Sequence, residues 1–255
     1  MPKTSSKTIW SPAPGMLDLQ PHQVDVWRVS LDLPTDSVKS IETSLSADES
    51  QRAARFHFAG DRDRFIAAHG SLRDILARYL HCEPSQLNFS VNPYGKPALQ
   101  DHKLEFNLSH SADFAMVVVA GAGKVGVDIE RIRPGISSQV IARQYFSRNE
   151  VAELELLALE QREVAFFTCW TRKEAYIKAQ GLGLSLPLDS FDVSLTPNES
   201  AIVRATRPDP KEAARWTLLS LHVDPRYESA VAVRPNGGSE SHGLEFRLWD
   251  WNTNF

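Results

Sequence analysis

The sequence lacks the features that assign a chain to several large classes of protein. It has only 2 cysteines in 255 residues, Cys82 and Cys169, and they form no CxxC pair. A disulfide framework or a metal-thiolate site is therefore not expected, and we predict that both thiols are buried. No apolar run approaches the ~20 residues that cross a bilayer, and Met1 to Lys7 lack the apolar core of a signal peptide. We therefore expect a cytoplasmic protein with no membrane partner.

The sequence also lacks a long basic run. Its formal net charge is −4, so it does not offer the broad positive surface with which proteins bind duplex nucleic acid. A polyanionic ligand would have to be held by a local cluster of cations. Apolar residues make up 42% and charged residues 24%, an ordinary composition for one large globular domain or two small lobes.

Hydrophobic periodicity indicates the order of elements in the first half. Residues 24–31 alternate apolar and polar side chains, which predicts a half-buried strand. Ser46 and Glu49 have the spacing of a capping box, and we predict a helix from there to about Phe58. A second helix is predicted over 62–80, where apolar residues recur at helical spacing. Short strand-like runs follow at 87–91, 105–109 and 114–120, and Gly121-Ala122-Gly123 ends the last of them.

The second half repeats this order. We predict a strand over 125–132, helical segments over 136–180, with a further capping box at Ser147 to Glu150, and strands near 191–195, 216–223 and 229–233. Residues 236–239 are typical of a linker, and 244–251 would then add an edge strand. The predicted fold class is α+β, with two similar lobes, 1–123 and 124–255, related by a pseudo-two-fold axis. The cleft between them is the expected ligand site.

Two acidic residues share one face of the strand that opens the second half. Asp128 and Glu130 stand at i and i+2, so their side chains leave the same face about 6.6 Å apart. Such a pair could grip one Mg²⁺ ion, which accepts a few carboxylates and keeps positions for water and substrate phosphates. Taken alone, the pair is better explained as the solvated face of a half-exposed strand.

An amphipathic helix is predicted over residues 166–178, with a glycine cap at Gly181. Trp170, Glu174 and Lys178 are spaced by four and lie on one side of it. Glu174 could be a third metal ligand or a base, and Lys178 could neutralise a phosphate as charge develops. Taken alone, they are better explained as an ordinary surface pair of Glu and Lys.

Further basic residues have weaker signals. Ser109 and His110 are neighbours on a strand and so point to opposite faces, which argues against a nucleophile and base pair. Tyr94-Gly95-Lys96-Pro97 is typical of a turn. Four arginines on the early helices leave room for a phosphate clamp, although such residues are more often solubilising: Arg52, Arg55, Arg64 and Arg73.

Several motifs, taken together, resemble those of one family in their sequences and in their order along the chain. These motifs are Gly95-Lys96-Pro97 and the stretches 106–111, 125–130, 170–178 and 181–191. They are similar to those of the 4′-phosphopantetheinyl transferases, specifically the long two-lobed type that activates surfactin synthetase. The resemblance extends from about Ser46 to Val233. A mild departure is Thr171-Arg172, where this type often has Ser-Met.

The resemblance implies an activity and a set of site residues. The chain would transfer the phosphopantetheine arm of coenzyme A to a serine of an apo acyl or peptidyl carrier protein, releasing 3′,5′-ADP. Asp128, Glu130 and Glu174 would bind Mg²⁺, and Lys178 would contact the phosphate that is attacked. The remaining residues implied at coenzyme A are Lys96, His110 and Ser109, with Arg52 and Arg64 aligned more loosely. Either Glu174 or a metal-bound water would take the serine proton.

Two lobes in one chain would complete the cleft without a neighbouring subunit, so we expect a monomer. Two alternatives remain open beside the transferase. One is a non-catalytic coenzyme A-binding module, which would need a broken metal site, whereas all three carboxylates are present. The other is a metal-dependent pyrophosphate hydrolase, which would release free phosphopantetheine without a carrier. The identity of the carrier protein stays open.

Overall fold

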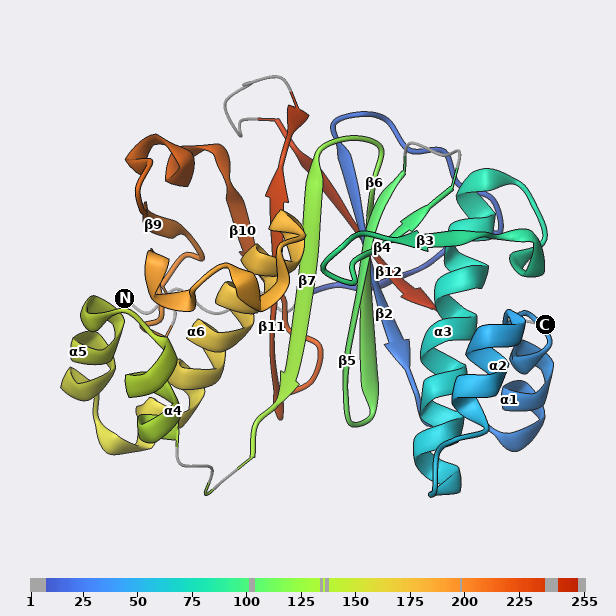
Figure 1. Ribbon diagram of the computed structural model, residues 1–255, viewed down its shortest axis with the longest axis horizontal. Coiled ribbons are helices and arrows are strands. Elements are labelled where there is room, and N and C mark those ends of the chain that lie inside the picture. The colour runs from blue at the N-terminus through green and yellow to red at the C-terminus, as the bar shows by residue number, and fades with distance from the viewer. Residues whose placement is uncertain are drawn as a thin grey trace.

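The computed structural model describes residues 8–100, 104–133, 135, 138–197, 199–236 and 243–251. Strands form the middle of the molecule, with helices α1, α2 and α3 on one side and α4, α5 and α6 on the other (Figure 1). This mixed α and β architecture agrees with the predicted fold class. Within the described ranges, no helix is both long and apolar enough to span a bilayer.

The first half contains most of the larger sheet. Its helices are α1 (Thr35–Glu42), α2 (Ala47–Ala53) and α3 (Ala59–Leu80), followed by a 3-10 turn at Pro84–Gln86. Its strands are β1 (Ser11–Pro12), β2 (Gln23–Ser30), β3 (Phe89–Val91), β4 (Pro97–Leu99), β5 (Glu105–Ser111) and β6 (Phe114–Ala120).

The described part of the second half also contains three α-helices. Its helices are α4 (Ser138–Tyr145), α5 (Arg148–Leu156) and α6 (Leu159–Gln180), and its 3-10 turns are Gly183–Ser185, Leu188–Ser190 and Pro210–Arg215. Its strands are β7 (Lys124–Arg131), β8 (Phe191–Val193), β9 (Val203–Thr206), β10 (Thr217–Ser220), β11 (Tyr227–Arg234) and β12 (Glu245–Trp251).

Several local signals give the predicted elements. Ser46 and Glu49 form a complete capping box on α2, as do Ser147 and Glu150 on α5. Gly181 ends α6 with a φ of 72°, a conformation that glycine adopts without steric cost. The prediction that the first helix reaches Phe58 was wrong, because α2 ends at Ala53 and α3 already begins at Ala59. The predicted linker at 236–239 lies mostly outside the described residues.

Two sheets pack against each other through one apolar core. The strand order is β1-β12-β2-β6-β5 in the larger sheet and β10-β11-β7 in the smaller one. Buried valines of β2 and β6 pack on Val125, Val127 and Ile129 of β7. Strand β7 therefore has an apolar face toward the larger sheet, and its other face is free to meet α6.

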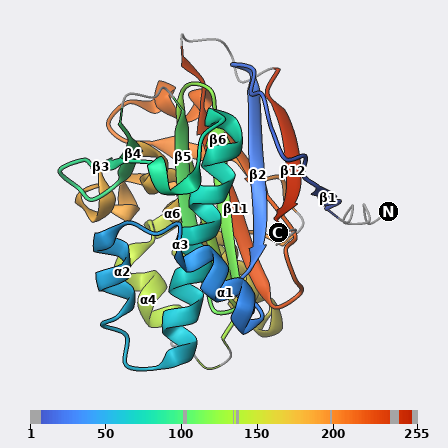
Figure 2. The ribbon, with the colours of Figure 1, turned by 90° about the vertical axis from the view of Figure 1, so that its right-hand side faces the viewer.

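The last strand lies inside the larger sheet, so the prediction of an edge strand was wrong. Strand β12 runs parallel to β2, with Trp249 opposite Trp27, and β1 covers its outer side (Figure 2). A strand of two residues, such as β1, shows no alternation of apolar and polar residues from which it could be predicted. A chain segment beyond residue 243 therefore completes a sheet built from the first half.

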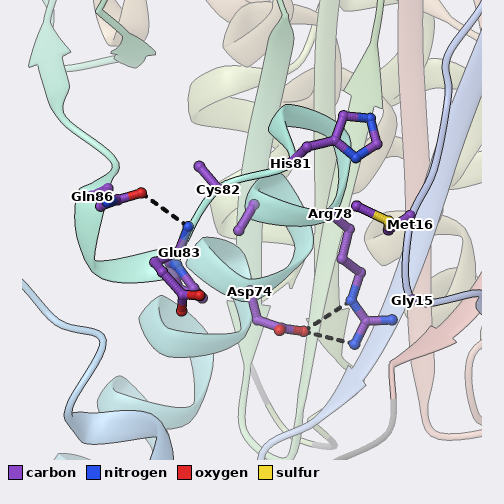
Figure 3. A pocket seen from close by; sticks show the side chains of 10 residues that line it. Gly15, Met16, Asp74, Arg78, His81, Cys82, Glu83 and Gln86 are labelled. Carbon is purple, nitrogen blue, oxygen red and sulfur yellow. Dashed lines mark hydrogen bonds and ion pairs between the residues drawn. The ribbon is translucent and has the colours of Figure 1, made fainter.

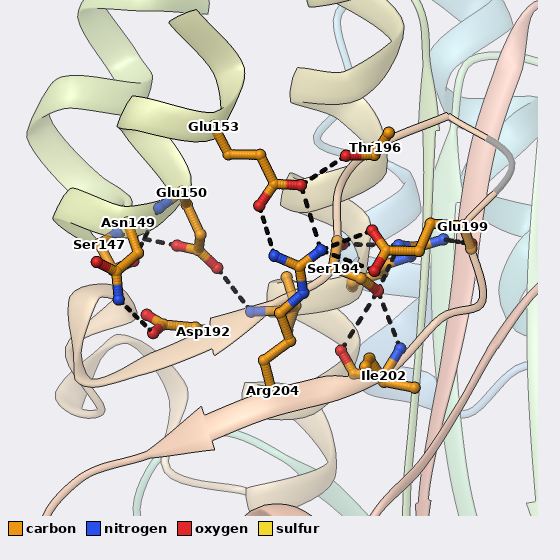
Figure 4. Close-up of polar contacts among 12 residues, drawn as sticks. Ser147, Asn149, Glu150, Glu153, Asp192, Ser194, Thr196, Glu199, Ile202 and Arg204 are labelled. Atoms are coloured by element: carbon orange, nitrogen blue, oxygen red, sulfur yellow. Dashed lines mark hydrogen bonds and ion pairs between the residues drawn. The ribbon is translucent and has the colours of Figure 1, made fainter. Parts of the chain in front are cut away.

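Polar contacts hold the β8–β9 ribbon against α5 (Figure 4). Arg204 Nη1 lies 2.5 Å from Glu153 Oε2, and Arg204 Nη2 lies 2.7 Å from Glu199 Oε2. Thr196 Oγ1 donates to Glu153 Oε1 at 2.6 Å, and Asn149 Nδ2 donates to Asp192 Oδ2 at 3.0 Å. These contacts attach the β8–β9 ribbon to α5, which packs beside α6.

The two cysteines differ in burial. Cys169 is fully buried, as predicted, whereas Cys82 is partly exposed, so its predicted burial was wrong. Cys82 follows the left-handed residue His81, which ends α3, and it lines an open cavity of about 440 Å³ (Figure 3). This cavity lies at the C-terminal end of α3, and none of the residues implied at coenzyme A line it.

Two ion pairs join β12 to β2 and differ in burial. Asp25 is fully buried and accepts hydrogen bonds from Arg247 Nε at 2.6 Å and from the Tyr79 hydroxyl at 2.5 Å. Arg28 and Asp250 form the second pair at 2.6 Å, with side chains 26% and 32% exposed. Removing Arg247 leaves the charge of the fully buried Asp25 uncompensated, whereas the charge of Asp250 remains partly in contact with water.

We therefore expect Arg247→Met to lower the free energy of unfolding by about 3 kcal/mol and Arg28→Met by about 1 kcal/mol or less. Urea unfolding monitored by tryptophan fluorescence measures both. Equal losses for the two variants would contradict the account of the buried pair.

Candidate active site

A glycine sets the distance between α6 and β7. A Cβ atom on Gly126 would lie 2.2 Å from the Ala175 carbonyl oxygen and 2.4 Å from the Ala179 nitrogen, both backbone atoms of the helix. Because neither atom belongs to a flexible side chain, a larger residue would push the helix away. The helix therefore lies directly on the strand face that carries the two acids.

The close packing joins Asp128 to Lys178. Lys178 Nζ lies 2.5 Å from Asp128 Oδ1, and Ser109 Oγ donates to the same oxygen at 2.9 Å. Asp128 is 2% exposed. Its second oxygen, Oδ2, is buried and has no hydrogen-bond partner within the described part of the chain. Such an oxygen is costly to leave unpaired, so it marks a position where a ligand would be stabilised.

Strand β5 holds β7 with alternating polar side chains. Asn107 Oδ1 accepts a hydrogen bond from the Val127 backbone N–H at 2.9 Å. Ser111 Oγ donates to Glu130 Oε2 at 2.9 Å and accepts from the Arg131 N–H at 3.1 Å. Together with Ser109, these side chains form a ladder between the strands and fix the direction of both acids. The ladder explains the N-x-S-x-S spacing of residues 107–111.

The three carboxylates of the site share one electrostatic field. Burial and then the negative charge of Asp128 raise the pKa of Glu174 to about 7, with a further contribution from Glu130, although Lys178 opposes the shift. Burial and Asp128 also raise the pKa of Glu130. Lys178, with Arg133 near Glu130, does not offset the three neighbouring carboxylates. A further cation would lower the free energy of the ionised site.

The donor set fits a hard cation. Within the described ranges, no group of three or more His, Cys, Asp or Glu side chains is already arranged to hold a metal ion. The oxygens available are nevertheless those that Mg²⁺ prefers, and this ion needs only one or two carboxylates besides water and phosphate. The unpartnered Asp128 Oδ2 and the raised pKa of Glu174 are what a carboxylate site without its cation would have.

A basic cavity lies on the other face of β5. It has a volume of about 570 Å³ and is formed by α2, α3, the β3–β4 hairpin and β5. Arg52, His69 and His110 line it, together with Asp48 and the ion pair of Glu49 and Arg73. Burial lowers the pKa of His110, and the charges of His69, Lys178 and Arg52 lower it further. The same positive field would attract an anion such as a phosphate.

The predicted opposite orientation of Ser109 and His110 is confirmed. Ser109 meets the acids of β7, whereas His110 lines the cavity. Strand β5 thus lies between a carboxylate group and a basic cavity. His69 was missed in the sequence because a single histidine on a helix gives no pattern.

Three further basic residues lie outside the cavity or are already paired within it. Arg64 pairs with Asp113 at 3.1 Å and does not line the cavity. Arg73 lines it, but its guanidinium is 2.7 Å from Glu49 and also bonds two backbone carbonyls. Lys96 Nζ donates to the Val125 carbonyl at 3.0 Å, so its ammonium turns away from the cavity.

Lys173, the neighbour of Glu174, faces the protein interior. Its ammonium is fully buried and lies 2.8 Å from Glu150 Oε2. It also donates to the carbonyls of Leu188 at 2.7 Å and Phe191 at 2.6 Å. This side chain anchors α6 from its core side, so the rotation of the helix about its axis is fixed with Glu174 toward the acids.

Comparisons with known proteins show to which family this chain belongs. A family model described as the 4′-phosphopantetheinyl transferase superfamily matches residues 124–233, and one described as 4′-phosphopantetheinyl transferase, N-terminal, matches residues 34–123. The 4′-phosphopantetheinyl transferase HetI of a Nostoc species is 39% identical over 88% of this chain and 93% of that protein. The 4′-phosphopantetheinyl transferase Sfp of Bacillus subtilis is 31% identical over 74% of this chain and 82% of that protein.

A more distant relative is the mouse L-aminoadipate-semialdehyde dehydrogenase-phosphopantetheinyl transferase, 25% identical over 80% of this chain and 72% of that protein. An acidic group beside a cavity lined by cations suits a phosphorylated ligand that binds together with a metal ion. The family matches show that this chain belongs to the 4′-phosphopantetheinyl transferase superfamily. The family resemblance inferred from the motifs is thereby confirmed.

The raised pKa of Glu174 makes the stability of the metal-free protein depend on pH. The folded protein keeps this proton up to about pH 7, whereas an unfolded chain releases it near the ordinary value of 4.5. Because the folded-state pKa is the higher one, stability falls as the pH rises through this window.

We expect Glu174→Gln to raise the free energy of unfolding at pH 8 by up to about 2 kcal/mol, after allowance for the partial exposure of the carboxyl. At pH 4.5 the two proteins should be nearly equal. Urea unfolding in EDTA at both pH values measures the difference. A variant that is less stable than the wild type at pH 8 would contradict the shared field of the carboxylates.

Proposed function

We propose that this chain transfers the phosphopantetheine arm of coenzyme A to a serine hydroxyl of an apo acyl or peptidyl carrier protein. The serine oxygen bonds to the β-phosphorus, the bond from that phosphorus to the bridging oxygen breaks, and 3′,5′-ADP leaves. The observation that supports this best is the pair of environments on β5: a carboxylate group with an unpartnered oxygen on one face, and a basic cavity on the other.

Three side chains are assigned to a Mg²⁺ ion: Asp128, Glu130 and Glu174. The ion would offset the negative charge of the pyrophosphate. Lys178 then stabilises the charge that accumulates on the phosphate under attack, since its ammonium already lies at Asp128. Ser109 bonds both of these side chains and so holds them in place. The serine proton would pass to Glu174 or to a water held by the ion; the pKa of about 7 is that of Glu174 in the metal-free protein, and a bound cation would lower it.

The basic cavity is assigned to the nucleotide part of coenzyme A. Arg52 and His110 face it from α2 and β5, and both would neutralise the 3′-phosphate. The positive charges that lower the pKa of His110 would be offset by that phosphate, so binding should raise this pKa. Arg64 has a smaller part in this proposal, because Asp113 already pairs with it.

We also propose that the chain consists of two similar α+β lobes, 1–123 and 124–255, related by a pseudo-two-fold axis with the active site in the cleft between them. The two matching family models meet at residues 123 and 124, which supports this division. Strand β12 is an exception, since it returns to the sheet of the first lobe. One chain would then supply both walls of the cleft, and the protein would act as a cytoplasmic monomer.

The metal assignment is tested by removing each carboxylate. We expect Asp128→Asn, Glu130→Gln and Glu174→Gln each to reduce transfer to an apo carrier by at least about 10², the scale of losing a major electrostatic stabiliser. Stabilisation of the protein by Mg²⁺ should shrink in the same variants. Mass spectrometry of the carrier and melting curves with and without Mg²⁺ measure the two effects.

Glu228 offers a matched control. It lies opposite Glu130 on β11, burial raises its pKa, and it accepts a hydrogen bond from Thr168 and lines a different cavity with Arg172. Glu228→Gln should transfer at a rate within about threefold of the wild type. Near-normal transfer by Asp128→Asn would overturn the metal assignment, and release of free phosphopantetheine without any carrier would indicate a hydrolase.

A further inference from the structure

The turn of the β3–β4 hairpin is bonded to the end of helix α6. Asn92 Oδ1 accepts the backbone N–H groups of Tyr94 and Lys96, each at 2.9 Å, which closes the turn. The amide nitrogen of the same side chain donates to the Gly181 carbonyl at 2.8 Å. One side chain therefore shapes the hairpin and connects it to a residue 89 positions later in the sequence.

Lys96 makes a second connection from the same turn. Its ammonium donates to the carbonyls of Val125 at 3.0 Å and Ala179 at 3.5 Å, and so bridges β7 and α6. The last carbonyls of a helix have no partner within the helix, and a cation is favourable beside them. Burial is the main cause that lowers the pKa of Lys96, in agreement with a lysine enclosed between elements.

Gly181 leaves room for both contacts. A Cβ atom there would lie 3.3 Å from Asn92 Nδ2 and 3.4 Å from Lys96 Cδ, and the φ of 72° is one that other residues rarely adopt. The left-handed cap thus turns the Gly181 carbonyl toward the hairpin while the two side chains approach the helix closely. We call Asn92, Lys96 and Gly181 the hairpin latch.

The same hairpin forms part of the basic cavity. Gly95 and Pro97, the neighbours of Lys96, line that cavity, whereas Asn92 and Lys96 do not. On the side of the latch, Lys178 precedes Gly181 by one helical turn, and its ammonium lies at Asp128. The hairpin therefore touches the nucleotide side of the proposed site with one face and the helix of Lys178 with the other.

We propose that Asn92 and Lys96 are positioning residues, which hold the last turn of α6 against the hairpin and thereby place Lys178 relative to the ligand in the cavity. This proposal rests on the transferase function proposed above. It differs from the role in phosphate binding that the family resemblance implies for Lys96.

The two roles of Lys96 predict different losses. If Lys96 binds the 3′-phosphate, its loss should weaken the binding of coenzyme A. It should not weaken the binding of dephospho-coenzyme A, which lacks the 3′-phosphate. A positioning residue would affect neither affinity and would reduce kcat, because a displacement of about 1 Å at a reacting group costs up to about 10² in rate. The experiment therefore combines kcat for transfer with calorimetric Kd values for both ligands.

Two variants break the latch in different ways. Lys96→Met keeps the length of the side chain and removes its charge and donors. Asn92→Asp keeps the oxygen that closes the turn, but replaces the donor to the Gly181 carbonyl with a second oxygen. Lys96→Arg restores the charge and the donors. The matched control is Lys124→Met, because Lys124 lies at the same end of α6 and bonds the Gln180 side chain instead of a backbone carbonyl.

We expect Lys96→Met and Asn92→Asp to lower kcat about tenfold and to leave both Kd values within about twofold of the wild type. Lys96→Arg should recover most of the loss, and Lys124→Met should match the wild type. His110→Ala should show the opposite pattern and weaken coenzyme A binding more than dephospho-coenzyme A binding. Unchanged affinity for coenzyme A also demonstrates that a variant is folded.

Two results would overturn the hairpin latch while leaving the transferase function intact. One is a kcat of Lys96→Met equal to that of Lys124→Met. The other is a loss of coenzyme A affinity in Lys96→Met that dephospho-coenzyme A does not share, which would make Lys96 a phosphate ligand. Wild-type protein that transfers nothing to any apo carrier would instead overturn the proposed function, and this proposal with it.

Discussion

The close approach of α6 to β7 at Gly126 is the constraint on which the rest of the site depends. Backbone atoms of the helix lie where any side chain at residue 126 would begin. Only at this distance does the Lys178 ammonium reach Asp128 two positions further along the strand. The apolar core between β7 and the larger sheet holds the strand from behind, so the acids are presented on a rigid surface.

In the site, one of two adjacent residues often stabilises the fold while the other faces the proposed ligand. On α6, Lys173 is buried against Glu150 and two carbonyls, whereas Glu174 faces the other carboxylates. On β5, Ser109 meets Asp128 while His110 lines the basic cavity. Strand and helix periodicity produce this division directly, because adjacent side chains leave a strand on opposite faces and a helix about 100° apart. A short motif can therefore carry both the fold and its chemistry.

The sequence predicted the elements that have strong local signals. The two capping boxes, the glycine cap at Gly181 and the D-x-E strand all depend on residues within a few positions of each other. Helix α1 gave no such signal, because it is short and buries only Val38 and Ile41. Strand β12 was misplaced, because its partners are backbone groups of β2 and an aspartate far away in the sequence. The contact of Lys96 with the Val125 carbonyl was not foreseen for the same reason. Such contacts have no local pattern.

The central claim is that the carboxylates around Lys178 are a cation site for a phosphorylated substrate. Anomalous diffraction from a crystal grown with Mn²⁺, which prefers oxygen ligands as Mg²⁺ does, and with coenzyme A measures it most directly. The account predicts a peak at about 2.2 Å from oxygens of Asp128, Glu130 and Glu174, with the nucleotide in the cavity beside Arg52 and His110. A peak held by other residues, or a nucleotide bound outside that cavity, would contradict it.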